Sequence, residues 1–181
     1  NVSIDSKLDH FIKIIKTQFE KEPNRKIVVF TEFSDTANHL YDNVKDKFRT
    51  FKYSSGDATK KNKNTIKENF DASFKGKHKN DYDLLIATDS ISEGYNLHRA
   101  GTIFNFDIPY NPTRVIQRIG RINRIDKKVF EELYIYNYFP TDIGETETRT
   151  KEISTLKIAV IQAILGEDTK VLTSEEELKS F

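Results

Sequence analysis

Short apolar runs that lack polar alternation are the feature that most constrains this fold. Residues 26–31 (KIVVFT) form one such run, and others follow at 83–88 (DLLIAT) and 102–107 (TIFNFD). A strand that is covered on both faces has this kind of sequence, whereas a strand with one wet face alternates. Shorter segments of similar character lie at 50–54 and 132–139. The sequence therefore predicts five largely buried strands.

Segments with helical periodicity separate these strands. Their apolar stripes are Leu8, Phe11, Ile12, Ile15 and Phe19 in the first, Ala37, Leu40, Tyr41, Val44 and Phe48 in the second, and Ile66, Phe70 and Phe74 in the third. Strands that alternate with helices over about 140 residues predict an α/β fold with a mainly parallel sheet and helices on both faces. Ligands of such sheets bind beyond the carboxyl ends of the strands.

The composition excludes several classes of protein. With 181 residues, 36% hydrophobic and 31% charged, the chain is sized for one core, with residues 141–181 as a loop and helical extension of it. The absence of cysteine excludes disulfides and thiolate metal sites. No apolar run approaches the ~18 residues of a membrane span, so we expect a cytoplasmic protein without a membrane partner. Because the chain begins at Asn1 and lacks methionine, we expect it to be a piece of a longer polypeptide.

Arginine is concentrated in one part of the chain. Residues 1–138 carry a net charge of +5 and residues 139–181 a net charge of −4. The overall charge of +1 therefore does not reveal that residues 1–138 are basic. Five of the eight arginines lie within 26 residues, at Arg99, Arg114, Arg118, Arg121 and Arg124. Lysine is enough for solubility, so this clustering indicates a need for the planar guanidinium group.

A fourth helix is predicted in this segment, with Asn111 as its N-cap and Pro112 at its first position. Arg114, Arg118 and Arg121 are spaced to share one face, and the opposite face is apolar (Val115, Ile116, Ile119 and Ile122). Crowded guanidinium groups repel one another unless an anion lies among them, which favours phosphate binding. The alternative is pairing with local carboxylates such as Asp107 or Glu93.

Residues 117–124 (QRIGRINR) resemble motif VI of the superfamily-two helicases. Residues 85–97 (LIATDSISEGYNL) are similar to motif V, and 26–40 (KIVVFTEFSDTANHL) to motif IV, in the family's order. Residues 107–112 (DIPYNP) resemble a linker of the Swi/Snf and RapA-like translocases. The C-terminal residues are also similar to bacterial helicases that carry a phospholipase-D-like nuclease domain.

This resemblance implies the second of two RecA-like lobes, with residues 1–140 as the three-layer lobe. Such a lobe shares an ATP site, with Mg²⁺ held mainly by the first lobe of the same chain, and no other small-molecule substrate is implied. It also implies DNA as a partner, with duplex DNA favoured and RNA left open. Carried over by motif position, the arginine fingers are Arg121 and Arg124, the nucleotide contacts are Glu93, Gly94, Asn96 and Gln117, and the nucleic-acid contacts are Ser55, Gly56 and Thr88.

Half of an ATP site is missing from the sequence. It contains no G-x-x-x-x-G-K-S/T loop, because Gly76-Lys77 is followed by His78, and no D-E-x-H box. We therefore expect the isolated chain not to hydrolyse ATP and to contribute its arginines only beside the first lobe.

Several alternatives stay open. A RecA-like module that binds nucleic acid or a partner without ATP chemistry has the same fold. A dinucleotide-binding Rossmann enzyme is disfavoured, because residues 31–35 (TEFSD) lack the glycines of its first turn. The lysines between 60 and 79 predict either a DNA-tracking groove or a solvated helix face. The four histidines are scattered, and no metal site is expected.

Overall fold

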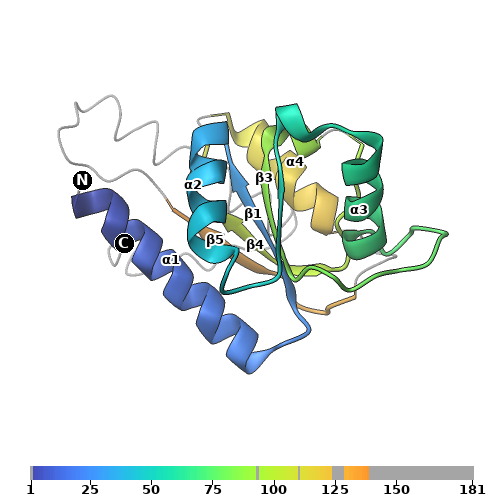
Figure 1. The fold of residues 1–181 in the computed structure, drawn as a ribbon, viewed down its shortest axis with the longest axis horizontal. Coiled ribbons are helices and arrows are strands. Elements are labelled where there is room, and N and C mark those ends of the chain that lie inside the picture. The colour runs from blue at the N-terminus through green and yellow to red at the C-terminus, as the bar shows by residue number, and fades with distance from the viewer. Residues whose placement is uncertain (1, 93, 110, 124–128, 139–181) are drawn as a thin grey trace, which may run out of the picture.

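A five-stranded parallel sheet forms the centre of the computed structural model, which describes residues 2–92, 94–109, 111–123 and 129–138 (Figure 1). The strands are β1 (Lys26–Thr31), β2 (Thr50–Tyr53), β3 (Leu84–Thr88), β4 (Ala100–Asn105) and β5 (Tyr134–Asn137). Their order is β2-β3-β1-β4-β5, and every pairing is parallel. The predicted α/β fold with a parallel sheet is thus confirmed.

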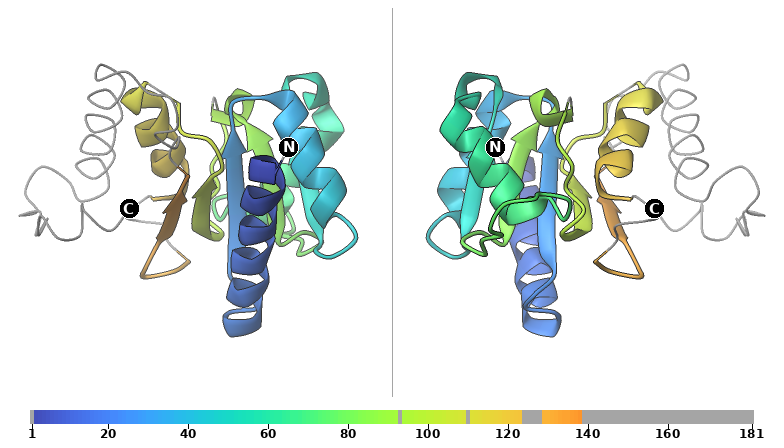
Figure 2. Two further views of the ribbon diagram at one scale, coloured as in Figure 1. Left: turned by 90° about the vertical axis from the view of Figure 1, so that its left-hand side faces the viewer. Right: turned by 90° about the vertical axis from the view of Figure 1, so that its right-hand side faces the viewer.

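Helices cover both faces of this sheet. Figure 1 shows α1 (Val2–Lys21) and α2 (Ser34–Val44) on one side, and α3 (Lys60–Phe70) and α4 (Pro112–Ile122) on the other. Turned by 90°, Figure 2 shows the strands spread side by side behind α1. The short 3₁₀ helices η1 (Ser55–Asp57) and η2 (Asp89–Ser92) follow β2 and β3. Three layers of this kind are the arrangement that the sequence predicts.

The central strand β1 explains the missing alternation in the sequence. Ile27 and Val29 pack with α1 and α2, whereas Val28 and Phe30 pack with the layer that contains α3 and α4. All four side chains are fully buried. Because both faces are dry, every position of β1 favours an apolar side chain, and the strand is a continuous apolar run.

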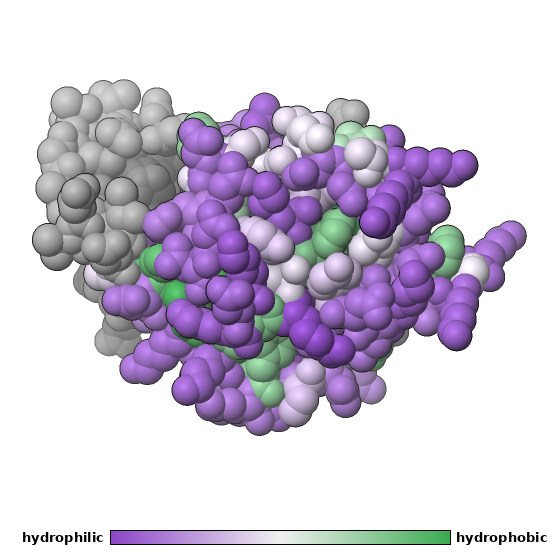
Figure 3. Space-filling view, viewed as in Figure 1, coloured by the Kyte–Doolittle hydropathy of each residue, from purple (hydrophilic) through white to green (hydrophobic). Residues whose placement is uncertain are grey.

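The outer surface is mainly polar. In Figure 3 hydrophilic residues dominate the visible face, and apolar residues occupy separate small areas. Within the described segments, no helix combines the length and apolarity needed to cross a membrane.

The ends of some elements differ from the prediction. The third helix ends at Phe70 instead of continuing to Phe74, because the Asp71 carboxylate accepts hydrogen bonds from the Ser73 backbone and hydroxyl and forms a turn. β4 begins two residues early, at Ala100, where its register with β1 shifts. The predicted extension over 141–181 and the end of the predicted last strand at 139 lie outside the described residues.

The aromatic contact between α1 and the sheet provides a test of this packing. Phe11 is fully buried and meets Phe104 and Phe106 edge-on, at ring-centroid distances of 4.8 and 5.4 Å. We expect Phe11→Ala to lower the free energy of unfolding by about 3–5 kcal/mol, because it leaves a cavity between α1 and β4. Urea denaturation measures this, with the exposed Lys16→Ala as a control that changes stability by less than about 0.5 kcal/mol. A loss below about 1 kcal/mol for Phe11→Ala would contradict the packing of α1 on the sheet.

Candidate functional site

Polar side chains gather where the parallel strands end, because the carboxyl ends of β1, β2, β3 and β4 lie at one edge of the sheet. We call this edge the rim. After β2, the Asp57 carboxylate accepts hydrogen bonds from the Ser54 backbone at 2.8 Å and the Ser54 hydroxyl at 2.7 Å. This capping box holds η1, in which Ser55 and Gly56 are exposed. The two predicted nucleic-acid contacts of η1 are therefore open to a ligand.

The next rim position, at the end of β3, is less open. Thr88 is only 5% exposed, and its hydroxyl lies 2.7 Å from the Ser90 hydroxyl. Thr88 was predicted as a phosphate contact, and the structure shows its side chain directed into a pair with Ser90 rather than freely into solvent. This hydroxyl pair could not be predicted from the sequence, because it depends on the turn into η2.

Gly94 and Asn96 occupy the loop after η2. Gly94 has φ +90°, a conformation that side-chain-bearing residues rarely adopt, so the backbone itself requires glycine here. Asn96 is half-buried, and its amide donates to the Ser73 hydroxyl at 3.4 Å, which directs it toward the turn after α3. Glu93, the third residue predicted in this loop, lies outside the described residues.

Helix α4 begins as the sequence predicts. The Asn111 side chain accepts a hydrogen bond from the Thr113 backbone at 3.0 Å, and Pro112 occupies the first helical turn. The helix continues through Gly120 to Ile122. At its end the Leu97 backbone N–H donates to the carbonyl of Arg121 at 2.9 Å. Both ends of α4 are therefore fixed, the second of them to the loop that carries Gly94.

Arg118 is fully buried, which is unusual for an arginine. Its Nε and Nη2 donate to the two carboxylate oxygens of Asp89 at 2.6 and 2.8 Å. Its Nη1 donates to the Asn105 side chain at 3.1 Å and to the Asp107 carbonyl at 3.0 Å, and the guanidinium lies over the Phe30 ring at 5.3 Å. This side chain joins α4 to the ends of three strands.

The predicted phosphate-binding cluster is therefore wrong for Arg118, and pairing with a local carboxylate holds instead. In the described part of the chain the carboxylate partner is Asp89, and Asp107 offers Arg118 only its backbone carbonyl. A signal was present, because Arg118 lies on the same helical stripe as the buried residues Val115, Ile119 and Ile122. Ile116, which was expected to be buried, is 47% exposed on the opposite side.

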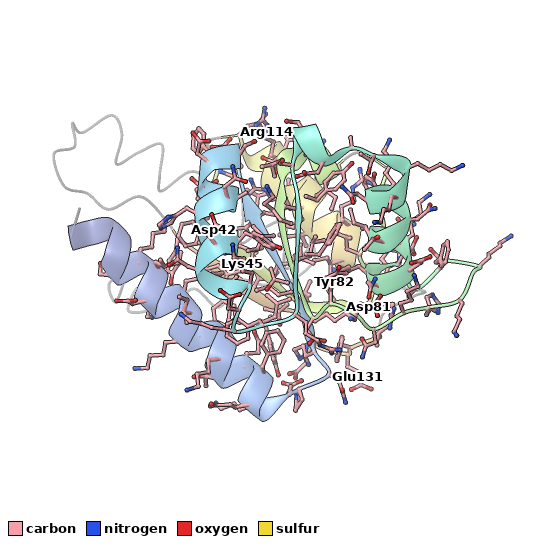
Figure 4. The ribbon with its side chains drawn as sticks, viewed as in Figure 1. Asp42, Lys45, Asp81, Tyr82, Arg114 and Glu131 are labelled. Carbon is pink, nitrogen blue, oxygen red and sulfur yellow. The ribbon has the colours of Figure 1, made fainter. Side chains whose placement is uncertain are left out.

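Arg114 lies at the rim, beside the start of α2, as Figure 4 shows. Its Nη1 is 3.3 Å from Glu32 and 3.8 Å from Asp89. Burial, followed by the Asp107 and Asp89 carboxylates, raises the pKa of Glu32. The backbone of Glu32 also donates to Asp107 at 2.7 Å. Carboxylates thus crowd this point, and Arg114 partly offsets their charge.

Arg121 and Gln117 lie on the open side of α4. Gln117 is exposed and Arg121 is half-buried. Within the described part of the chain, no ion pair joins the Arg121 guanidinium to another residue. Arg124 lies outside the described residues. Among the arginines of α4, Arg118 is paired with Asp89 and Arg114 with Glu32, whereas the charge of Arg121 is not compensated by an ion pair within the described residues.

A family comparison decides the identity of this arrangement. Residues 6–126 match the model of the helicase conserved C-terminal domain, which covers more than half of the chain. The chain belongs to this helicase C-terminal domain family. This helicase C-terminal domain has the RecA-like α/β fold, with a parallel sheet between two layers of helices.

Individual relatives agree with the family. The helicase domain is 30% identical over 156 residues to the uncharacterized ATP-dependent helicase YqhH of Bacillus subtilis, covering 84% of this chain and 25% of that protein. It is 31% identical over 117 residues to the DEAD-box ATP-dependent RNA helicase RhpA of Helicobacter pylori, covering 65% of this chain and 22% of that protein. The domain thus spans about a quarter of the length of these relatives.

Solved structures share the fold of this helicase domain. The C-terminal part of the Fun30 ATPase domain matches with a TM-score of 0.64 and 18% identity, over 83% of this chain and 44% of that one. Dbp5 of S. cerevisiae, bound to RNA and ADP BeF3, matches with a TM-score of 0.61 and 17% identity, over 85% of this chain and 36% of that one.

The buried ion pair gives the site a stability test. We expect Arg118→Ala to lower the free energy of unfolding by about 3–5 kcal/mol, because it leaves the Asp89 carboxylate without its bidentate partner. Arg114→Ala is the matched control on the same helix, and we expect a loss below about 1 kcal/mol because this side chain is 53% exposed. Equal losses in chemical denaturation would contradict the different roles of the two arginines.

Proposed function

We propose that this chain is the second motor lobe of an ATP-dependent helicase or translocase, and that Arg121 and Arg124 complete an ATP site on a first RecA-like lobe. The observation that carries the proposal is a difference between two arginines of α4. The charge of Arg118 is neutralised by Asp89, whereas Arg121 has no ion-pair partner in the described part of the chain. An uncompensated guanidinium on a helix that is held in place is suited to a transferring phosphoryl group.

The energetics favour this role. Phosphoryl transfer is accelerated mainly by positioning and by charges aimed at the reacting phosphate. Arg118 holds α4 against β3 and β4, so Arg121 needs little reorganisation when ATP binds. Mg²⁺ would be held by the first lobe, and Glu93, Gly94, Asn96 and Gln117 would line the nucleotide from this side. Without the first lobe, we expect the isolated chain to be inactive.

We further propose that the rim contacts the backbone of nucleic acid at Ser55, Gly56 and Thr88. The exposure of η1 and the lysines that follow it on α3 support this role. Duplex DNA stays our proposed track because residues 107–112 resemble the linker of the Swi/Snf and RapA-like translocases. RhpA is named an RNA helicase, so competition between DNA and RNA of equal length tests this choice. The nuclease domain proposed from the C-terminal residues is tested by the sequence of the complete gene.

ATP turnover tests the arginine fingers. In a polypeptide that joins this chain to its first lobe, we expect Arg121→Lys with Arg124→Lys to lower kcat about a thousandfold or more, because lysine cannot bridge phosphate oxygens with a planar fork. Lys16→Ala, on the exposed side of α1, is the control. Undiminished turnover by the double variant would contradict the finger role, whereas absence of turnover in the parent would support the alternative, a binding module without ATP chemistry.

Salt dependence tests the rim. We expect affinity for duplex DNA to fall steeply with salt, because phosphate contacts release counterions. Lys60→Gln with Lys61→Gln, at the start of α3, should weaken binding and reduce the slope of log affinity against log salt by up to about 2. Fluorescence anisotropy at several salt concentrations measures both. Binding that is insensitive to salt would contradict a backbone-contacting rim.

A further inference from the structure

Phe33 is the most exposed large apolar side chain of the described residues, at 60%, and it lies at the rim between β1 and α2. It follows Glu32, the partner of Arg114, whose place at the rim is labelled in Figure 4. A single exposed apolar residue is common on protein surfaces, and Phe33 differs from most of them in its position in the fold.

The position that Phe33 occupies normally belongs to a different kind of residue. Phe33 is the N-cap of α2, with φ −112° and ψ 130°, and it offers no side-chain hydrogen bond to the helix. Thr59 and Asn111 do cap α3 and α4, by accepting from the backbones of Asn62 and Thr113. A serine or aspartate at position 33 would stabilise α2. At position 33 the chain therefore has an exposed aromatic ring instead of a stabilising cap. Residues that lower local stability in this way are typical of functional positions.

The sheet order brings Phe33 into line with the proposed nucleic-acid contacts. β1 lies beside β3, and β3 lies beside β2, which leads into η1. Neighbouring strands are about 4.8 Å apart, so the end of β1 is about 10 Å from the end of β2 along the rim. This is about three base steps of a nucleic-acid strand at 3.4 Å each. A strand that contacts Ser55 and Gly56 therefore reaches Phe33 within a few nucleotides.

The charges around the ring determine which part of the strand it meets. Glu32 and Asp35 flank Phe33 in the chain, and Asp89 lies within 3.8 Å of the Arg114 that Glu32 contacts. These carboxylates disfavour a phosphate beside the ring. In contrast, the exposed Lys60 and Lys61 follow η1 and favour phosphates at the other end of the track. The base is the uncharged part of a nucleotide, and it stacks on aromatic rings, so a base is the part that Phe33 would contact.

From this geometry we propose that Phe33 stacks on an unpaired base of the nucleic acid that crosses the rim. The proposal rests on the proposed function, and it adds that the two strands of the duplex are separated where it crosses this lobe, so that a single-stranded segment lies at the rim. Phe33 contributes affinity through the base, whereas Ser55, Gly56 and the lysines contribute it through the backbone. Loss of the ring therefore leaves the salt dependence of binding unchanged.

The experiment compares Phe33→Ala, Phe33→Trp and the control Val129→Ala in the polypeptide that joins this chain to its first lobe. Val129 is also an exposed apolar residue, at 56%, two positions before Glu131 in the chain, and Figure 4 shows Glu131 at the opposite end of the molecule from Arg114. The probes are a labelled 20-nucleotide thymidine strand and an abasic strand of the same length. We expect Phe33→Ala to weaken binding of the thymidine strand by about 5- to 150-fold, while Phe33→Trp and Val129→Ala bind like the parent.

Two further measurements distinguish loss of base stacking from loss of folding. The slope of log affinity against log salt stays the same in Phe33→Ala, and the abasic strand binds equally to this variant and the parent. Phe33→Ser restores the cap, so it raises the melting temperature by a few degrees and still weakens binding of the thymidine strand. If Phe33 affected binding only through folding stability, Phe33→Ser would not both raise the melting temperature and weaken binding.

The proposal is overturned if Phe33→Ala binds the thymidine strand normally, or if it loses affinity for the abasic strand to the same extent. It is also overturned if Phe33→Ala changes ATP turnover without nucleic acid, since the ring would then pack against the first lobe. These failures differ from failure of the proposed function, which appears as undiminished turnover after substitution of Arg121 and Arg124.

Discussion

The bidentate ion pair between Arg118 and Asp89 is the interaction on which the rest of the site depends. A guanidinium that is fully withdrawn from water needs several acceptors, and Arg118 finds them on β4, on η2 and in the segment after β4. These bonds fix the rotation of α4 about its axis. The same rotation leaves Arg121 half-buried at the edge of the buried stripe of α4, so the contacts of one buried arginine set the position of the next.

The sheet determines the rest of the geometry. Because all five strands are parallel, their carboxyl ends form one rim, and the functional residues follow those ends whatever their distance in the sequence. Glu32, η1 and Asp89 follow three different strands, and the Arg114 guanidinium lies within 4 Å of two of them, Glu32 and Asp89. A ligand that binds at this rim therefore contacts elements that are 20 to 80 residues apart in the chain.

Much of this fold was predictable because its signals are local. The apolar run of β1 and the cap at Asn111 each follow from a few neighbouring residues, and both predictions are confirmed. The partner of Arg118 was not predictable, because Asp89 lies 29 residues away and approaches only through the sheet order. The same is true of the Thr88 and Ser90 pair and of the exposure of Phe33, which depend on how the strands end. The fingers themselves stay a prediction, since Arg124 lies outside the described residues.

We expect Asp89 to act on ATP turnover through the placement of Arg121. The most direct measurement is a double-mutant cycle of kcat with Asp89→Asn and Arg121→Lys in the two-lobe polypeptide, at a temperature where every variant is folded. We predict that Asp89→Asn slows turnover when Arg121 is present and adds almost nothing once Arg121 is lysine. Independent, fully additive losses would show that the buried pair does not position the finger.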